Sequence, residues 1–317
     1  MTGWLGRMQW GLLGLACLLS AGTAAAVTPR AAPAPVMPAH VLVLGRISDD
    51  PRAHHAQLQP LLDYVVARMG DVGIREGRVL MARDVQQMSS YLRRGRVDWV
   101  TETAGTAVAL GQRAHAVPVL LTERSGVREY HSVVFVRGDS PIHHLADLRG
   151  HTLALQSVAS TSAYLVPVMT LLQHGMAPQI LQGTDDTPPA DSVGYVFARS
   201  ELNIATFVHK GLVDAGAVSS VDWNDDRRVP AAFKRDMRVI LRSEPFPRAV
   251  ELVRGDLDPR VRERLRQVLL DAADDPAARE PLRKFFGTSG FHGVDARMQK
   301  RLDDLGRGLV RVRMEVE

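Results

Sequence analysis

The sequence predicts an α/β fold with two similar lobes, each a mostly parallel sheet flanked by helices, and a hinge of two strands between them. Two observations predict this architecture. Short apolar runs alternate with segments of helical spacing from residue 41 onward, and the same alternation restarts near residue 131. Alternation of this kind builds right-handed βαβ units with helices on both faces of a parallel sheet. A chain of 317 residues is also long enough to give each lobe its own core.

The first unit begins with the apolar run Val41–Leu44, which is typical of a buried parallel strand. Apolar residues between Leu58 and Met69 then recur at the spacing of one helix face. The other elements expected in this unit are strands at 79–82, 97–100 and 117–121, and helices at 85–92 and 104–110.

The second unit begins with an expected strand at 131–136. Its other expected strands lie at 152–155, 213–217 and 238–242, and its expected helices at 142–148, 164–173 and 206–210. We expect the chain to cross between lobes near 129–132 and near 242–245. These crossings give a first lobe of residues 40–130 and 243–317 and a second lobe of residues 131–242. Two further helices are expected in the returning segment, an amphipathic one at 259–273 and a short one near 298–305.

The first 26 residues have the pattern of a cleaved secretory signal peptide. Arg7 precedes the apolar run Trp10–Ser20, and small residues follow as far as Ala26. Residues 27–39 are rich in Pro and Ala, which predicts a flexible linker. A lipoprotein signal with lipidation at Cys17 is the alternative, and both readings place the protein in the periplasm. Cys17 is the only cysteine, so the chain after cleavage has no disulfide.

Composition and motifs argue against several classes of function. The formal net charge is +4, but the basic residues are scattered among acids and form no stripe with interleaved aromatics, so nucleic acid is not an expected partner. No nucleophile elbow, Walker loop, zinc-protease motif or dinucleotide fingerprint follows the signal segment, so we expect no enzymatic activity, no catalytic residues and no cofactor. The pairs His54–His55 and His143–His144 lack further ligands at suitable spacing, so no metal site is expected.

The segment from Leu155 to Pro167 is the most informative one for function. A strand is expected to end at Leu155, and a helix is expected to begin near Thr161, with Ser160 or Thr161 as its cap. The free N–H groups and the dipole at a helix N-terminus attract oxyanions, and the hydroxyls of Ser160, Thr161 and Ser162 add donors. The alternative is a plain helix cap, which any Ser-Thr-Ser run provides.

Several motifs in the right order resemble those of the periplasmic binding proteins of phosphate, phosphite and phosphonate importers. The resemblance covers residues 41–273 and rests on these segments: Glu129–Val136, Asp139–Ile142, Asp147–Gly150, Ser160–Ser162, Tyr164–Pro167 and Gly211–Gly216. It implies the type II periplasmic binding fold. In that family the Ser-Thr-Ser turn holds phosphonate oxygens, which implies that Ser160, Thr161 and Ser162 bind the ligand.

The rest of the predicted pocket departs from this family pattern. The family's first-lobe tyrosines fall on Val85 and Glu102, its second-lobe histidine falls near Glu201, and its carboxylate falls near Val221 or Asp222. Glu102 directly follows an expected strand, where ligands contact such sheets. We interpret Glu102 and Glu201 as acceptors for an ammonium group or a protonated oxygen of the ligand, the alternative being two ordinary surface carboxylates.

Two more residues are candidates for the site. Arg46, just after the first strand, is placed to reach an anion in the cleft, although an arginine in so Arg-rich a chain can equally be a surface residue. Tyr130 lies at an expected crossing, where it either packs in the hinge or lines the cleft.

The resemblance implies a binding protein that captures a small oxyanion or zwitterion by closing its lobes. Its partner would be a membrane permease with a cytoplasmic ATPase, together forming an ABC importer. A sensory protein that presents its ligand to a membrane histidine kinase is the alternative, and a periplasmic enzyme on the same scaffold is a third. We expect the protein to be a monomer.

Overall fold

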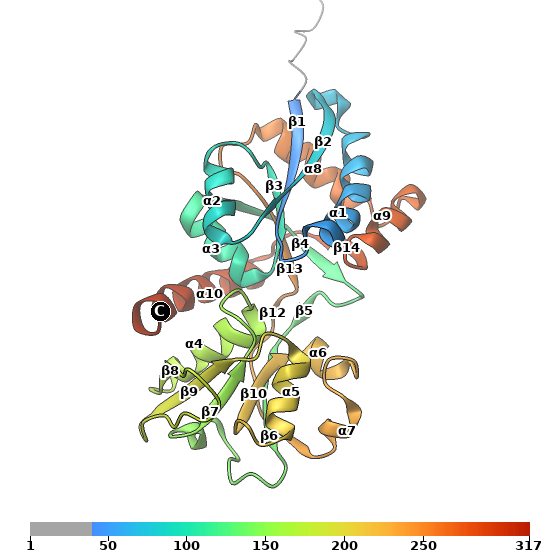
Figure 1. The fold of residues 1–317 in the computed structure, drawn as a ribbon. Helices are drawn as coiled ribbons and strands as arrows, with labels where there is room; N and C mark the ends of the chain where they lie inside the picture. Colours follow the sequence, from blue (N-terminus) through green and yellow to red (C-terminus); the bar gives the residue numbers. More distant parts are fainter. Residues whose placement is uncertain (1–39) are drawn as a thin grey trace, which may run out of the picture. The chain divides into compact units, whose positions relative to one another are not determined.

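Two six-stranded sheets and a separate two-stranded pair organise the computed structural model, which describes residues 40–317. The first sheet has the strand order β14-β4-β13-β3-β1-β2, and the second has the order β11-β6-β10-β7-β9-β8 (Figure 1). The predicted signal peptide, the linker and Cys17 lie outside the described residues. The strands are β1 His40–Ile47, β2 Ile74–Ala82, β3 Trp99–Glu102, β4 Val117–Arg124, β5 Glu129–Tyr130, β6 Ser132–Arg137, β7 Thr152–Leu155, β8 Ala177–Ile180, β9 Ser192–Phe197, β10 Ala215–Ser219, β11 Met237–Arg242, β12 Phe246–Pro247, β13 Ala249–Val253 and β14 Thr288–His292.

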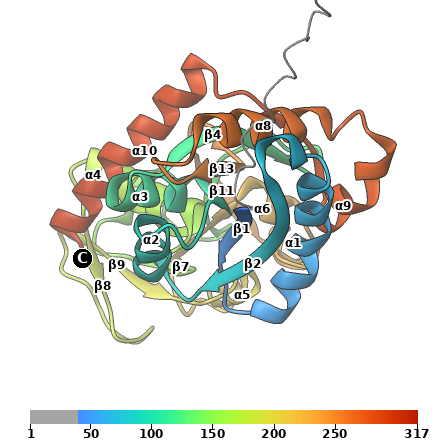
Figure 2. The ribbon, with the colours of Figure 1, turned by 90° about the horizontal axis from the view of Figure 1, so that it is seen from above.

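Helices cover both faces of each sheet. The helices are α1 Pro51–Val66, α2 Val85–Arg93, α3 Ala104–Ala114, α4 Val166–Gln173, α5 Glu201–His209, α6 Ser220–Asn224, α7 Ala231–Lys234, α8 Pro259–Asp271, α9 Arg279–Lys284 and α10 Ala296–Glu315. On the first sheet, α1, α8 and α9 pack on one face, and α2, α3 and α10 pack on the other (Figure 2). On the second sheet, α5 and α4 lie on opposite faces. No helix among residues 40–317 is both long enough and apolar enough to cross a bilayer.

The two-lobed α/β fold is as predicted, and each sheet combines parallel strands with antiparallel ones. In the second sheet the strands β8, β9, β7 and β10 pair in parallel. In the first sheet, β1 pairs in parallel with β2 and β3, whereas β13 is antiparallel to β3 and β4, and β14 is antiparallel to β4. The sequence prediction missed β13 and β14 because neither is a continuous apolar run. Glu251 interrupts β13, and β14 is mostly polar. In the second sheet, β6 is antiparallel to both β10 and β11.

The two-stranded pair lies where the chain passes between the two sheets. Glu129–Tyr130 pairs with Phe246–Pro247, and the ring of Tyr130 lies 4.6 Å from that of Phe246. Strands before β5 and after β12 belong to the first sheet, and strands β6 to β11 belong to the second. This antiparallel pair is the two-strand hinge of the fold.

Helix α10 is longer than the short helix predicted near 298–305, and it contacts helices that belong to both lobes. It packs against α3 beside the first sheet and against α4 beside the second (Figure 1). Two glycines allow the close approach. A Cβ at Gly306 would lie 3.2 Å from Val108 of α3, and one at Gly308 would lie 2.1 Å from Met169 of α4. The apolar face of α10 therefore belongs to one core cluster shared by the two lobes.

Candidate ligand-binding site

The hydroxyl-rich turn follows β7 at the carboxyl edge of the second sheet. Ser160 is the cap, as predicted: its Oγ accepts a hydrogen bond from the N–H of Ala163 at 3.1 Å. One π-helical turn, Thr161–Leu165, then leads into α4. Thr161 and Ser162 are buried, and the carbonyl of Ser162 accepts a hydrogen bond from Ser132 Oγ. The turn is thus a fixed part of the second lobe.

A direct contact joins this turn to the first lobe. The N–H of Gly105 donates to Thr161 Oγ1 at 2.9 Å, and Thr161 Oγ1 donates to Thr103 Oγ1 at 3.1 Å. A Cβ at position 105 would lie 2.8 Å from Thr161 Oγ1, so only glycine allows this approach. Thr103 and Gly105 begin α3, and two helix N-termini therefore meet here. Both helix dipoles raise the positive potential between the lobes.

The first lobe places charged residues at the sheet edge that holds this contact. β1, β3 and β4 run in one direction, and β13 and β14 run in the opposite one. The edge therefore collects the ends of β1, β3 and β4 and the starts of β13 and β14. These positions hold Arg46, Glu102 and Arg124, with Arg248 just before β13 and Phe286 two residues before β14.

Arg46 and Glu102, both predicted, are neighbours at this edge. The Oε1 of Glu102 accepts the N–H of Ile47 at 2.8 Å, and its Oε2 lies 3.7 Å from Arg46 Nη1. Arg46 Nη1 also donates to the carbonyl of Thr101 at 2.9 Å. All of these contacts lie within the first lobe, and Glu102 is only 4% exposed. A direct contact of either residue with a ligand stays a prediction.

Arg124, Arg248 and Phe286 were not predicted, yet they complete the group around Arg46. The guanidinium carbons of Arg46 and Arg124 lie 4.6 Å and 4.4 Å from the centroid of the Phe286 ring. Phe286 has a φ of +55°, a conformation that bulky residues rarely adopt. Burial, together with repulsion from Arg46 and Arg248, lowers the pKa of Arg124 to about 9.

Tyr130 packs in the hinge, which is one of the two predicted alternatives, and it contacts residues of both lobes; that it lines the cleft stays a prediction. Its ring lies against Phe246, and the guanidinium carbon of Arg248 is 5.0 Å from the centroid of the Tyr130 ring. Burial raises the pKa of its hydroxyl, and a hydrogen bond with the Ser162 side chain opposes that shift. Tyr130 therefore links the arginine group to the hydroxyl-rich turn.

Glu201 begins α5 at the carboxyl edge of the second sheet. It is buried and accepts a hydrogen bond from Gln156 Nε2 at 2.9 Å, and Arg228 Nη1 lies 3.3 Å away. Burial and the nearby charge of Asp222 raise its pKa, while Arg228 acts in the opposite direction. Gln156 directly follows β7, so Glu201 is connected to the start of the segment that holds the turn.

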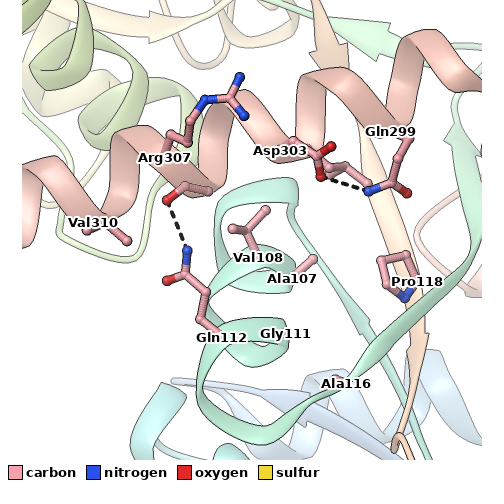
Figure 3. A pocket seen from close by; sticks show the side chains of 12 residues that line it. Ala107, Val108, Gly111, Gln112, Ala116, Pro118, Gln299, Asp303, Arg307 and Val310 are labelled. Atoms are coloured by element: carbon pink, nitrogen blue, oxygen red, sulfur yellow. Dashed lines mark hydrogen bonds between the residues drawn. The ribbon is translucent and has the colours of Figure 1, made fainter.

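Two hollows lie at the surface of the described residues. One, of about 500 Å³, is lined by Val127 of the β4–β5 connection and by five residues between Ser220 and Asp226, so it lies beside the hinge. The other, of about 400 Å³, lies between α3 and α10, where Gln112 Nε2 donates to the carbonyl of Gly306 (Figure 3). None of the predicted site residues lines either hollow. Within residues 40–317, no group of three or more His, Cys, Asp or Glu side chains is arranged to hold a metal ion.

Arg124 was missed because the end of its strand was placed too early. The strand was expected to end at Leu121, and β4 continues to Arg124. Arg248 and Phe286 precede β13 and β14, the two strands that the prediction missed. The sequence therefore gave no sign that these residues lie at the same sheet edge as Arg46.

Comparison with known proteins identifies the family. The family model described as "ABC transporter, phosphonate, periplasmic substrate-binding protein" matches residues 47–298. The structure titled "XAC2383 from Xanthomonas citri bound to ATP" is 57% identical with a TM-score of 0.83, covering 87% of this chain and 99% of that chain. The same protein bound to chloride ion is 58% identical with a TM-score of 0.82, covering 86% and 98%.

More distant structures share the fold. PhnD1 from Prochlorococcus marinus in complex with methylphosphonate is 17% identical with a TM-score of 0.60, and the match covers 86% of this chain and 98% of that chain. The fold is that of the type II periplasmic binding proteins. The family match over residues 47–298 shows that the chain belongs to the periplasmic substrate-binding proteins of phosphonate ABC transporters, a family of binding proteins and not of enzymes.

Proposed function

We propose that the chain is the solute-binding component of an ABC importer and captures a small oxyanion between its lobes at the turn Ser160–Ser162. The observation that carries this proposal is the hydrogen bond from the N–H of Gly105 to Thr161 Oγ1, which joins the start of α3 to the turn. This contact brings two helix N-termini and the hydroxyls of Thr103 and Thr161 together. Such an arrangement favours a negatively charged group with several acceptor oxygens.

We further propose that this group is a phosphate or phosphonate. The family match names phosphonate transporters, and the 57% identical XAC2383 was solved bound to ATP. Both ligands present tetrahedral oxygens to their binding proteins. Glu102 and Glu201 are proposed to contact other groups of the ligand, as their positions at the two facing sheet edges allow.

The remaining parts of the proposal concern export and partners. A signal peptide at residues 1–26, with cleavage before the linker, delivers the protein to the periplasm. The lobes comprise residues 40–130 with 243–317, and residues 131–242. The ligand-bound monomer is then recognised by the permease. If the neighbouring genes encode a sensor kinase in place of a permease and an ATPase, the same binding event serves sensing.

The direct test is calorimetric titration of the purified protein with phosphate, phosphite, methylphosphonate, an aminoalkylphosphonate and ATP. We expect at least one to bind, and we expect Thr161→Val to weaken that binding about tenfold or more, because the change removes one hydroxyl and keeps the side-chain shape. A wild-type protein that binds none of the five contradicts the proposal.

Thr170→Val is the matched control for this test. Thr170 lies in α4, and within residues 40–317 its Oγ1 bonds only to the carbonyl of Val166 in the same helix. The control removes a hydroxyl of the same kind a few residues from the turn. Equal loss of affinity in both variants would mean that the turn does not contact the ligand.

A further inference from the structure

The arginine group on the first lobe has more positive charge than its surroundings neutralise. Glu102 uses one oxygen for the N–H of Ile47 and stands 3.7 Å from Arg46. Glu251 is fully buried and accepts hydrogen bonds from Trp99, Thr101 and Thr122. Within the described part of the chain, neither Arg124 nor Arg248 has a carboxylate within ion-pair distance.

The unpaired donors of this group are buried. Arg124 is 6% exposed, and one Nη donates to Thr101 Oγ1 at 3.0 Å, while its Nε has no hydrogen-bond partner within residues 40–317. The Nε of Arg46 is also buried without a partner in that range. Buried donors that lack partners are costly, and each calls for an explanation such as an ordered water or a bound anion. The Nε atoms of Arg238 and Arg262 are in the same position, so it is the clustering of Arg46 and Arg124 around Phe286 that points to an anion here.

The local electrostatics agree with an excess of positive charge. A guanidinium in a protein keeps its proton. Burial is the main cause of the lowering of the Arg124 pKa to about 9; the charges of Arg46 and Arg248 add to it, while Glu251 and Glu102 oppose it. Burial also lowers the pKa of His54, and Arg46 adds to that effect, while Asp49, Glu102 and Asp50 act in the opposite direction. His54 lies 5.8 Å from Phe286, ring centroid to ring centroid.

Resting on the proposed function, we propose that Arg46, Arg124 and Arg248 form a second anion subsite on the first lobe, which binds a further phosphate group of the same ligand. Tyr130 stands between this subsite and the turn, close to Arg248 on one side and to Ser162 on the other. A single phosphate on the turn leaves the arginines unoccupied. The ligand class that fills both subsites is an oligophosphate, with two or more linked phosphate groups.

The chemistry of the arginines favours phosphate in this position. The planar guanidinium presents its N–H groups as a fork that matches the spacing of phosphate oxygens. Phe286 holds the planes of Arg46 and Arg124 from one side, which limits their rotation and leaves their other donors available. The oligophosphate can be inorganic or part of a nucleotide, and the titrations below separate these sources.

The test compares the affinities of a series of phosphate ligands at one ionic strength, because salt screening changes the affinity of every charged ligand. Phosphate, pyrophosphate, tripolyphosphate, AMP and ATP are titrated into the wild-type protein. We expect pyrophosphate to bind about tenfold or more tightly than phosphate, because it adds charge-assisted hydrogen bonds. If tripolyphosphate binds as tightly as ATP, the ligand is an inorganic oligophosphate. If ATP binds more tightly than tripolyphosphate, the ligand is a nucleotide.

The variants assign this preference to the arginines. Arg124→Gln should reduce the preference for pyrophosphate to near unity and leave the affinity for phosphate within about threefold. Arg248→Gln should act in the same direction and is the milder variant, because the Arg248 guanidinium forms no hydrogen bond within residues 40–317; it loses only the contact with the Tyr130 ring.

Arg254→Gln is the matched control. Arg254 is a largely buried arginine at the opposite edge of the same sheet, where it pairs with Asp98 at 2.9 Å. This variant should lose stability and keep the preference. Equal wild-type affinities for phosphate and pyrophosphate, or a preference that survives both arginine variants, would overturn the inference and leave the turn intact. If the affinity for phosphate did not depend on Thr161, that result would contradict the proposed function.

Discussion

Glu201 is the residue whose protonation can be followed most directly. Its pKa is raised above the ordinary value by burial and by Asp222, so the folded state binds its proton more tightly than the unfolded chain does. A raised pKa contributes stability that is fully present below the unfolded value of about 4.3. That contribution is lost as the pH rises through the folded value.

We therefore expect the free energy of unfolding of Glu201→Gln to fall less than that of the wild type as the pH rises from 4 to 7. The difference should be about 1.4 kcal/mol for each unit by which the pKa is raised. Glutamine keeps the hydrogen bond from Gln156 and cannot ionise, so the shape of the site is preserved. Urea unfolding of both proteins at several pH values measures this difference. Parallel profiles would show that Glu201 does not titrate with a raised pKa.

Part of the candidate site follows from local sequence and part does not. Within a dozen residues around Ser160, the sequence shows the end of a strand, a run of hydroxyl residues and the start of a helix. The cap forms there as predicted. Arg248 and Phe286 come more than a hundred residues after Arg124 in the sequence, and the three meet only because β13 and β14 flank β4. That adjacency depends on strand order, which local patterns do not contain.

At the scale of elements, helix α10 offers a comparison between two glycines, Gly306 and Gly308, that lie two positions apart. A Cβ at Gly306 would lie 3.2 Å from Val108, a contact that a small shift relieves. A Cβ at Gly308 would meet three atoms of the buried Met169 at 2.1 to 2.6 Å. Alanine in a helix interior is favoured over glycine by about 1 kcal/mol, and overpacking works against that gain.

We expect Gly306→Ala to be neutral or slightly stabilising and Gly308→Ala to be less stable than Gly306→Ala by about 1–2 kcal/mol. Denaturant unfolding of the two variants measures this, and each serves as the control for the other. Equal stabilities would mean that Met169 moves away without loss and that α10 is not tightly packed on α4.

The elements most visible in the sequence were those with a simple periodicity. The helix expected at 259–273 appears as α8 at Pro259–Asp271, and the strand expected at 238–242 appears as β11 at Met237–Arg242. The prediction passed over β8 and β9 because a long polar segment, residues 182–191, separates them. β9 is nonetheless an interior strand of the second sheet, and its tertiary setting explains its burial.

For the whole molecule, Gly105 controls how closely the lobes approach. Any side chain there meets Thr161 Oγ1 at 2.8 Å and Leu165 Cδ2 at 3.0 Å. We expect Gly105→Ala to weaken ligand binding about tenfold or more, because it destabilises the closed arrangement that the ligand requires. Titration calorimetry measures the affinity. In the presence of ligand, small-angle scattering should show a larger radius of gyration for Gly105→Ala than for the wild type.

Gly111→Ala is the control for this variant, because it makes the same change in the same helix. Its Cβ would lie 3.4 Å from the carbonyl oxygen of Ala116, an ordinary contact. We expect its affinity to match that of the wild type. If both variants bind ligand normally, the contact between Gly105 and Thr161 has no part in closure.

The position of β13 between β3 and β4 decides the order in which the lobes can be completed. β6 to β11 come from one continuous stretch, Ser132–Arg242, so the second sheet has all its strands before residue 249 is synthesised. β1 to β4 appear earlier but lack the strand that joins β3 to β4, and their open edges stay exposed until it arrives. A chain that emerges from its N-terminus therefore completes its second lobe before its first, and its earliest strands need protection from aggregation until β13 is made.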